Sequence, residues 1–298
     1  VESFTLPEDR NIFSYVMERH QRNNAANGKI MNYLYQTFLY PNGFDTVLYA
    51  SQLLQAEAIK YGVEHFRRNR GRCMGAVYWQ LNDIWPVASW SSIDYHFRWK
   101  ALHYYARRFF HPLMISCHEE GLLTQDPNAN HQPQVKEKIE KSFRLAVSNE
   151  TMSEKRLRVK WEIRDRSAGV LKEKAVSVKV PALSSLWLDR VEVPGIAIDD
   201  EYLSYHLFEG DRPVSEGTVI FSLPKFFHWA DPKLTCTVEG DAITVKAAAY
   251  AKSVEILNKN GDLVLSDNYF DMNGGTRTVR ILHGKPEGLR LRSVYDIR

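Results

Sequence analysis

The stretch that decides the fold is RCMGAVYWQLNDIWPVASWSSIDYHFRWKALHYYARRFF, which runs from Arg72 to Phe110. Its first eight residues, Arg72–Trp79, form an apolar run without polar alternation, which is typical of a strand buried on both faces in a parallel sheet. The aromatic-rich loop Gln80–Phe97 follows, and apolar residues at helical spacing then predict a helix over 98–110. A parallel strand needs neighbouring strands, and we expect these upstream of Val1.

The residues before this stretch carry helical patterns. TLPE at 5–8 has the spacing of a capping box and predicts one helix over 5–20. Apolar residues at helical spacing predict two further helices, over 28–39 and over about 44–68. Helices around a buried strand suit the last part of a (β/α)8 barrel, in which active sites lie at the carboxyl ends of the strands. Asp94 could cap the helix that follows the loop.

After residue 112 the hydrophobic period changes to two. In RLRVKWEIRD (156–165) apolar residues alternate with charged ones, which predicts a half-buried antiparallel strand with Trp161 in the core. Trp187 also has an alternating position and is predicted to be buried. Strands separated by turn residues at close spacing are typical of a β-sandwich, and we expect them around 143–147, 176–180, 186–193, 202–208 and 219–223.

SLPKFFHWADPK contains two prolines and indicates a joint near Pro224, after which a second set of strands begins. Asn273–Gly275 is predicted to be a turn. The predicted fold class is therefore α/β plus all-β. Residues 1–112 form the C-terminal fragment of a (β/α)8 barrel, residues 113–223 an immunoglobulin-like β-sandwich, and residues 224–298 a second one.

The composition argues against several classes of protein. The net charge of +3 is small and the basic residues are scattered, so neither a nucleic-acid nor a membrane partner is supported. The three cysteines lie far apart, so we expect reduced, buried thiols and a cytoplasmic protein. Neighbouring side chains on a strand point to opposite faces, so CHEE at 117–120 is not expected to bind a metal. No cofactor is predicted.

The residues quoted above resemble a known family. The stretch 72–110 is similar to the eighth barrel strand, the following loop and the last helix of the β-mannosidase branch of glycoside hydrolase family 2. SDNYFDM (266–272) resembles the terminal immunoglobulin-like domain of that branch. The resemblance covers essentially the whole chain and weakens to architecture in the first sandwich. It implies the C-terminal portion of a retaining exo-β-mannosidase, with a β-mannoside oligosaccharide and the missing N-terminal part of the same protein as partners.

The resemblance also implies where the site residues lie. Retaining glycosidases need two carboxyl groups roughly 5 Å apart, and the resemblance places both upstream of Val1. No catalytic residue is therefore assigned, and the isolated chain is expected to be inactive. Trp79 matches the tryptophan that family enzymes place under the sugar, where an indole covers the C–H face of a pyranose. Asn82 and Asp83 could bind sugar hydroxyls, but a role in shaping the turn is favoured for both.

Several alternatives remain open. From its residues alone, Trp79 is more simply a core tryptophan, and Trp85 and Trp90 could line an outer pocket or pack the loop. The chain could be a non-catalytic carbohydrate-binding or scaffold protein, or it could belong to another family 2 activity, a β-galactosidase or a β-glucuronidase. Because a lone buried strand would leave its backbone groups unpaired, residues 1–112 are expected to be ordered only against other protein.

Overall fold

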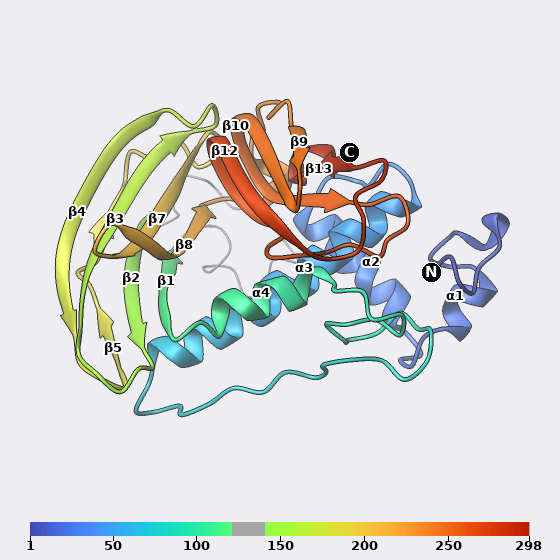
Figure 1. Ribbon diagram of the computed structural model, residues 1–298, viewed down its shortest axis with the longest axis horizontal. Helices are drawn as coiled ribbons and strands as arrows, with labels where there is room; N and C mark the ends of the chain where they lie inside the picture. Colours follow the sequence, from blue (N-terminus) through green and yellow to red (C-terminus); the bar gives the residue numbers. More distant parts are fainter. Residues whose placement is uncertain (121–140, 298) are drawn as a thin grey trace. The chain divides into compact units, whose positions relative to one another are not determined.

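The computed structural model describes residues 1–120 and 141–297 (Figure 1). The chain divides into two compact units, which are considered separately. The first unit comprises Val1–Lys60, Val77–Arg107 and Asp231–Arg298, and the second comprises Tyr61–Ala76 and Arg108–Ala230. The domain boundaries after residues 112 and 223 stay predictions.

Most of the predicted helices are present. The helical elements before residue 112 are the 3-10 helix η1 (Pro7–Asp9), α1 (Tyr15–Arg19), α2 (Ala26–Thr37), α3 (Phe44–Arg68) and α4 (Ala101–Phe109). The helix predicted over about 44–68 is confirmed at both ends, and those predicted over 28–39 and 98–110 are confirmed with small shifts. Leu34 of α2 and Ala56 and Val63 of α3 are buried, as their helical spacing requires.

The single first helix predicted from the capping-box spacing is wrong, because the chain forms η1 and α1 instead. The Thr5 hydroxyl donates to the carbonyl oxygen of Val1 and caps no helix. Between the two elements, the Asn11 side chain accepts a hydrogen bond from the Phe13 amide, which is a local alternative to helical bonding. As a result α1 begins only after Ser14, whose hydroxyl oxygen caps it.

The buried strand predicted over 72–79 is also wrong for this structure. These residues form no strand, and Val77 is 100% exposed. A strand needs a neighbouring backbone for its amide and carbonyl groups, and none of the described segments provides one here. The assignment of residues 1–112 to a barrel therefore stays a prediction.

The second unit contains a β-sandwich of two antiparallel sheets, of order β1-β2-β5, with β6 beside β2, and β4-β3-β7-β8. Its strands, labelled in Figure 1 except for the short β6, are β1 (Leu113–Glu120), β2 (Ser142–Asn149), β3 (Lys155–Asp165), β4 (Val170–Val180), β5 (Ser184–Trp187), β6 (Val191–Glu192), β7 (Glu201–Glu209) and β8 (Arg212–Ile220). Alternate residues of both sheets meet in one core, which confirms the predicted sandwich. Trp161 is buried as predicted, whereas Trp187 is only partly buried.

The first unit ends in one connected sheet of order β11-β12-β10-β13, with β9 beside β10. Its strands are β9 (Thr235–Glu239), β10 (Ala242–Leu257), β11 (Val264–Leu265), β12 (Phe270–His283) and β13 (Arg290–Arg292). The turn predicted at Asn273–Gly275 is wrong, because these residues lie inside β12. Gly274 and Gly275 have φ values of 71° and 73° at a register shift opposite Ala247–Tyr250. Ala248 and Ala249 of β10 therefore oppose the single residue Gly274, which places the β-bulge on β10, and the glycines opposite it tolerate the positive φ found there.

A partly buried ion cluster joins α3, α4 and β10 within the first unit. Lys252 Nζ lies 3.3 Å from Glu57 Oε1 and 3.6 Å from Asp271 Oδ2. The Tyr105 hydroxyl donates to Glu57 Oε1 at 3.1 Å. Burial alone would raise the pKa of Glu57, but Lys252 and Lys60, with help from these hydrogen bonds, lower it to about 2. The cluster fixes the two helices to the sheet through charged contacts.

The predictions from composition have mixed outcomes. Cys117 is a buried free thiol, but Cys73 and Cys236 are free and only partly buried, so the prediction that all three are buried is wrong. Over residues 1–120 and 141–297, no helix has both the length and the apolar character needed to cross a membrane.

Candidate functional site

The loop between Tyr78 and Lys100 is held by its own backbone. The Ile93 amide donates to the Leu81 carbonyl at 2.8 Å, and the Asp83 amide donates to the Ile93 carbonyl at 3.2 Å. Isolated bridges pair Ile93 with Asn82 and with Trp99. The loop therefore has a defined shape although it contains no regular strand.

Asp83 is the polar centre of this loop. It is buried, and its two carboxylate oxygens accept hydrogen bonds from the hydroxyls of Ser89 and Ser91, each at 2.5 Å. The exposed Asn82 donates from its side chain to the Asp83 carbonyl at 3.2 Å. Both residues therefore shape the turn, as their residue types favour, and a direct contact with substrate stays a prediction for each.

We expect Asp83→Ala to lower the free energy of unfolding by about 2–3 kcal/mol, because two hydrogen bonds to a charged group are lost and the buried Ser91 hydroxyl loses its acceptor. Urea denaturation measures this difference. Asn82→Ala is the matched control, with an expected change within about 0.5 kcal/mol. Equal effects of the two substitutions would contradict the role assigned to Asp83.

Trp79 is 73% exposed, and the apolar side chains nearby in the sequence, Val77, Leu81 and Ile84, are exposed as well. This exposure excludes a core role for Trp79 in the structure. Exposed apolar side chains gathered in one segment mark a surface that contacts another molecule or another part of the protein. Within the described residues, no hydrogen bond or ring contact joins Trp79 to Asn82 or Asp83.

The other two tryptophans of the loop have different environments. Trp85 stacks on His20 with ring centroids 5.2 Å apart, and the Arg22 guanidinium lies 4.7 Å from the centre of its ring. Trp85 therefore packs the loop against the segment before α2. Trp90 is partly exposed and lines a cavity. Sequence reasoning left both possibilities open for each of them.

The sequence suggested Asp94 as a cap of the next helix, but Asp94 does not cap it. Its carboxylate accepts hydrogen bonds from the His96 and Arg98 amides and from the Arg98 guanidinium, and it closes a turn before α4. The Ala101 amide at the start of α4 donates instead to Gln52 Oε1 at 3.1 Å. Because Gln52 lies 49 residues earlier, on α3, no local sequence signal identifies this cap.

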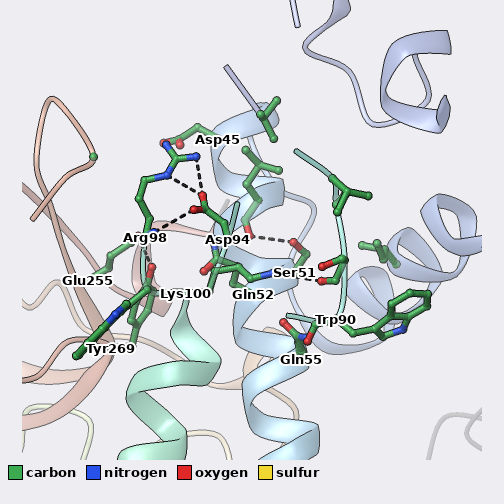
Figure 2. Close-up of a pocket in the computed structure, with 18 of the residues that line it drawn as sticks. Asp45, Ser51, Gln52, Gln55, Trp90, Asp94, Arg98, Lys100, Glu255 and Tyr269 are labelled. Carbon is green, nitrogen blue, oxygen red and sulfur yellow. Dashed lines mark hydrogen bonds and ion pairs between the residues drawn. The ribbon is translucent and has the colours of Figure 1, made fainter. Parts of the chain in front are cut away.

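The cavity that Trp90 lines has a volume of about 610 Å³ and lies within the first unit (Figure 2). Side chains from α3, from the loop and from the C-terminal sheet surround it, among them Ser51, Gln52, Gln55, Asp94, Arg98, Lys100, Glu255 and Tyr269. Its residues come from both ends of the chain and share no sequence pattern. Sequence reasoning therefore missed it.

Lys100 is the most perturbed charged group of this cavity. Its ammonium donates to the Ser89 carbonyl at 3.3 Å. Burial lowers the pKa of Lys100 to about 8, although the carboxylates of Asp83 and Asp94 act in the opposite direction. A partly desolvated ammonium beside a cavity can hold an anion or donate to hydroxyl groups.

Sequence comparisons relate two segments that contain the β-strands, and also most of the chain, to known proteins. A family model described as a mannosidase Ig/CBM-like domain matches residues 141–225, and an Ig-fold domain model matches residues 229–297. The β-mannosidase of Capra hircus is 41% identical over 114 residues, which are 34% of this chain and 13% of that protein. β-Mannosidase B of Aspergillus terreus is 26% identical over 269 residues, which are 89% of this chain and 30% of that protein. The chain thus spans less than a third of the length of these relatives.

Solved structures share the fold. The β-D-mannosidase of Dictyoglomus thermophilum superposes with a TM-score of 0.81 over 97% of this chain and 34% of its own, at 20% sequence identity. The exo-chitosanase of Amycolatopsis orientalis superposes with a TM-score of 0.56 over 85% of this chain and 35% of its own, at 16% identity.

Proposed function

Since the chain belongs to the β-mannosidases of glycoside hydrolase family 2, whose C-terminal part it resembles, we propose that it is part of a retaining exo-β-mannosidase. The enzyme hydrolyses terminal β-linked mannose from oligosaccharides. The observation that carries this proposal is the sequence match to β-mannosidase B of Aspergillus terreus over 89% of the chain. The chain contributes structure and substrate binding, and the nucleophile and the acid/base lie in the part that precedes Val1.

In this proposal residues 1–112 complete a (β/α)8 barrel with the preceding part of the protein, and the segment ending at Trp79 becomes its last strand. The apolar composition of this segment and the complete exposure of Val77 support the assignment, because neighbouring strands of a barrel would cover the Val77 side chain. Trp79 then lies at the carboxyl end of that strand, where active sites of such barrels are found.

Trp79 is the substrate-binding residue of this account. Its exposed indole is free to cover the apolar face of a mannose unit in the first subsite. Asp83 keeps the following loop in shape through Ser89 and Ser91, and the exposed Asn82 offers an amide to sugar hydroxyls. The two β-regions serve the barrel as supporting domains.

Hydrolysis of 4-nitrophenyl β-D-mannopyranoside tests the proposal. The full-length protein that contains this chain is expected to release nitrophenol and to give β-mannose as the first product anomer, observed by NMR. The 298-residue chain at the same concentration is expected to give no activity above buffer. Faster cleavage of the matching β-galactoside or β-glucuronide would replace the proposed activity with that one. Cleavage of none of the three would leave a carbohydrate-binding protein.

A further inference from the structure

Among the described residues, each acidic group that lines the cavity of the first unit has an ionic partner, whereas two of the cations in the lining have none. Its acidic groups are engaged, since Asp94 pairs with Arg98 at 2.6 Å, and Asp45 pairs with Arg292 at 2.7 Å. The other two acidic residues of the lining, Glu2 and Glu255, pair with Arg10 and Arg292.

Two cations of the lining, Lys29 and Lys100, have no such partner. Among the described residues, no carboxylate oxygen lies within 4.0 Å of either ammonium nitrogen. Lys29 lies on the exposed surface of α2, where water solvates its charge. Lys100 is partly buried, and within residues 1–120 and 141–297 its ammonium donates only to the Ser89 carbonyl. An ammonium has three donors, and one bond to a carbonyl neither uses them nor balances the charge. The site is therefore suited to an anion.

Two amides of α3 add directional groups beside this charge. Gln52 Oε1 accepts the Ala101 amide, which fixes the side chain and leaves its NH₂ group as a donor. Gln55 is fixed in the opposite sense, because its Nε2 donates to the Trp90 carbonyl at 2.6 Å and its oxygen remains an acceptor. A fixed donor and a fixed acceptor along one helix match the hydroxyl groups of a polyol.

We propose that this cavity binds a small polyhydroxylated anion, a sugar acid or a sugar phosphate, with Lys100 as its counter-charge and Gln52 and Gln55 as partners of its hydroxyl groups. The volume of about 610 Å³ is within the range of small-molecule sites, which is about 300–1,000 Å³. Trp79 is not part of the lining, so this site is separate from the proposed mannose subsite. The lowered pKa of Lys100 is consistent with an ammonium that gains from an anionic neighbour.

Isothermal titration calorimetry of the full-length protein that contains this chain, at pH 7, tests the proposal with three glucose-configured probes, chosen to avoid capture by a mannose subsite. D-Gluconate or D-glucose 6-phosphate is expected to bind with a Kd of about 1 mM or tighter, and neutral D-glucose at least tenfold more weakly. Tighter binding of gluconate identifies a carboxylate as the recognised group, and tighter binding of glucose 6-phosphate identifies a phosphate. Equal binding of all three probes, or binding of none, overturns the proposal.

Two variants locate the binding site. Lys100→Gln removes the counter-charge, and Gln52→Glu keeps the oxygen that accepts the Ala101 amide while placing a negative charge in the cavity. Each is expected to weaken anion binding at least tenfold. Lys246→Gln, which removes the same charge from an exposed position on β10, is the control and should leave the Kd unchanged.

Trp79→Ala is also expected to leave anion binding unchanged, so failure of this site and failure of the mannosidase proposal can be told apart. Thermal unfolding confirms that each variant is folded. If Lys100→Gln does not fold, Gln52→Glu alone decides the question. An unchanged Kd in a folded Gln52→Glu or Lys100→Gln variant contradicts the assignment.

Discussion

Trp79→Ala in the full-length enzyme is expected to lower kcat/KM for an aryl β-mannoside by about 50–100-fold. An indole carries about 150–250 Å² of surface, of which one face, about 100 Å², can cover the sugar. At about 25 cal/mol per Å², loss of this contact costs about 2.5 kcal/mol, and about 1.4 kcal/mol corresponds to a tenfold change in rate. Steady-state kinetics with 4-nitrophenyl β-D-mannopyranoside measures the effect.

Two further substitutions serve as controls for this prediction. Trp79→Phe keeps an aromatic face and is expected to lose less than tenfold. Ile84→Ala removes a side chain that is 87% exposed in the same loop and is expected to change kcat/KM less than threefold. If Trp79→Ala is no more damaging than Ile84→Ala in a folded enzyme, Trp79 does not bind the sugar.

Lys252→Met is expected to lower the free energy of unfolding of the first unit by about 2–3 kcal/mol. The substitution leaves the carboxylates of Glu57 and Asp271 without their shared cation. Breaking a fully buried ion pair costs about 3–5 kcal/mol, and the smaller value follows because the Glu57 side chain keeps 35% of its surface exposed. Urea denaturation at pH 7 measures the difference from the unsubstituted chain.

The matched control is Lys259→Met, which breaks an exposed pair with Glu287 and is expected to cost less than about 0.5 kcal/mol. A second readout comes from pH. Because the folded-state pKa of Glu57 is depressed to about 2 from 4.5, its contribution to stability is complete above pH 4.5 and is lost as pH falls towards 2. The difference between Lys252→Met and the unsubstituted chain should therefore narrow over this range. A constant difference would contradict the electrostatic explanation.

The elements that the sequence predicts well are those whose signal is local and long. α3 could be predicted at both ends because 25 residues keep one helical period. The core position of Trp161 could be predicted because apolar residues alternate with charged ones along the sequence of β3. In both cases the pattern of burial along one element depends only on that element's own geometry.

The predictions that the structure contradicts failed for two physical reasons. The single helix predicted at the start of the chain does not form, because side chains such as Asn11 make hydrogen bonds to nearby backbone groups. These bonds compete with helical backbone bonds, and the spacing of apolar residues does not reveal them. The segment Asn273–Gly275 has the composition of a turn, but it lies inside β12 because β12 pairs with β10 on both sides of it. Neither outcome is encoded in the local hydrophobic pattern.

The candidate site shows both kinds of result. The residue type of Asp83 predicts that it shapes the turn, but it does not predict that Ser89 and Ser91 are its hydrogen-bond partners. The cavity around Lys100 could not be predicted, because Gln52 and Glu255 meet there only after folding. The apolar segment that ends at Trp79 predicts a buried strand. In our account the segment forms this strand in the full-length protein, where the part before Val1 supplies the neighbouring strands.

A crystal structure of the full-length enzyme with a bound mannose-configured inhibitor tests the central claim most directly. The account predicts that the segment ending at Trp79 pairs in parallel with a strand from before Val1, and that the Trp79 indole lies within about 4.5 Å of the pyranose ring. Antiparallel pairing of this segment, or a Trp79 indole buried away from the inhibitor, would contradict it.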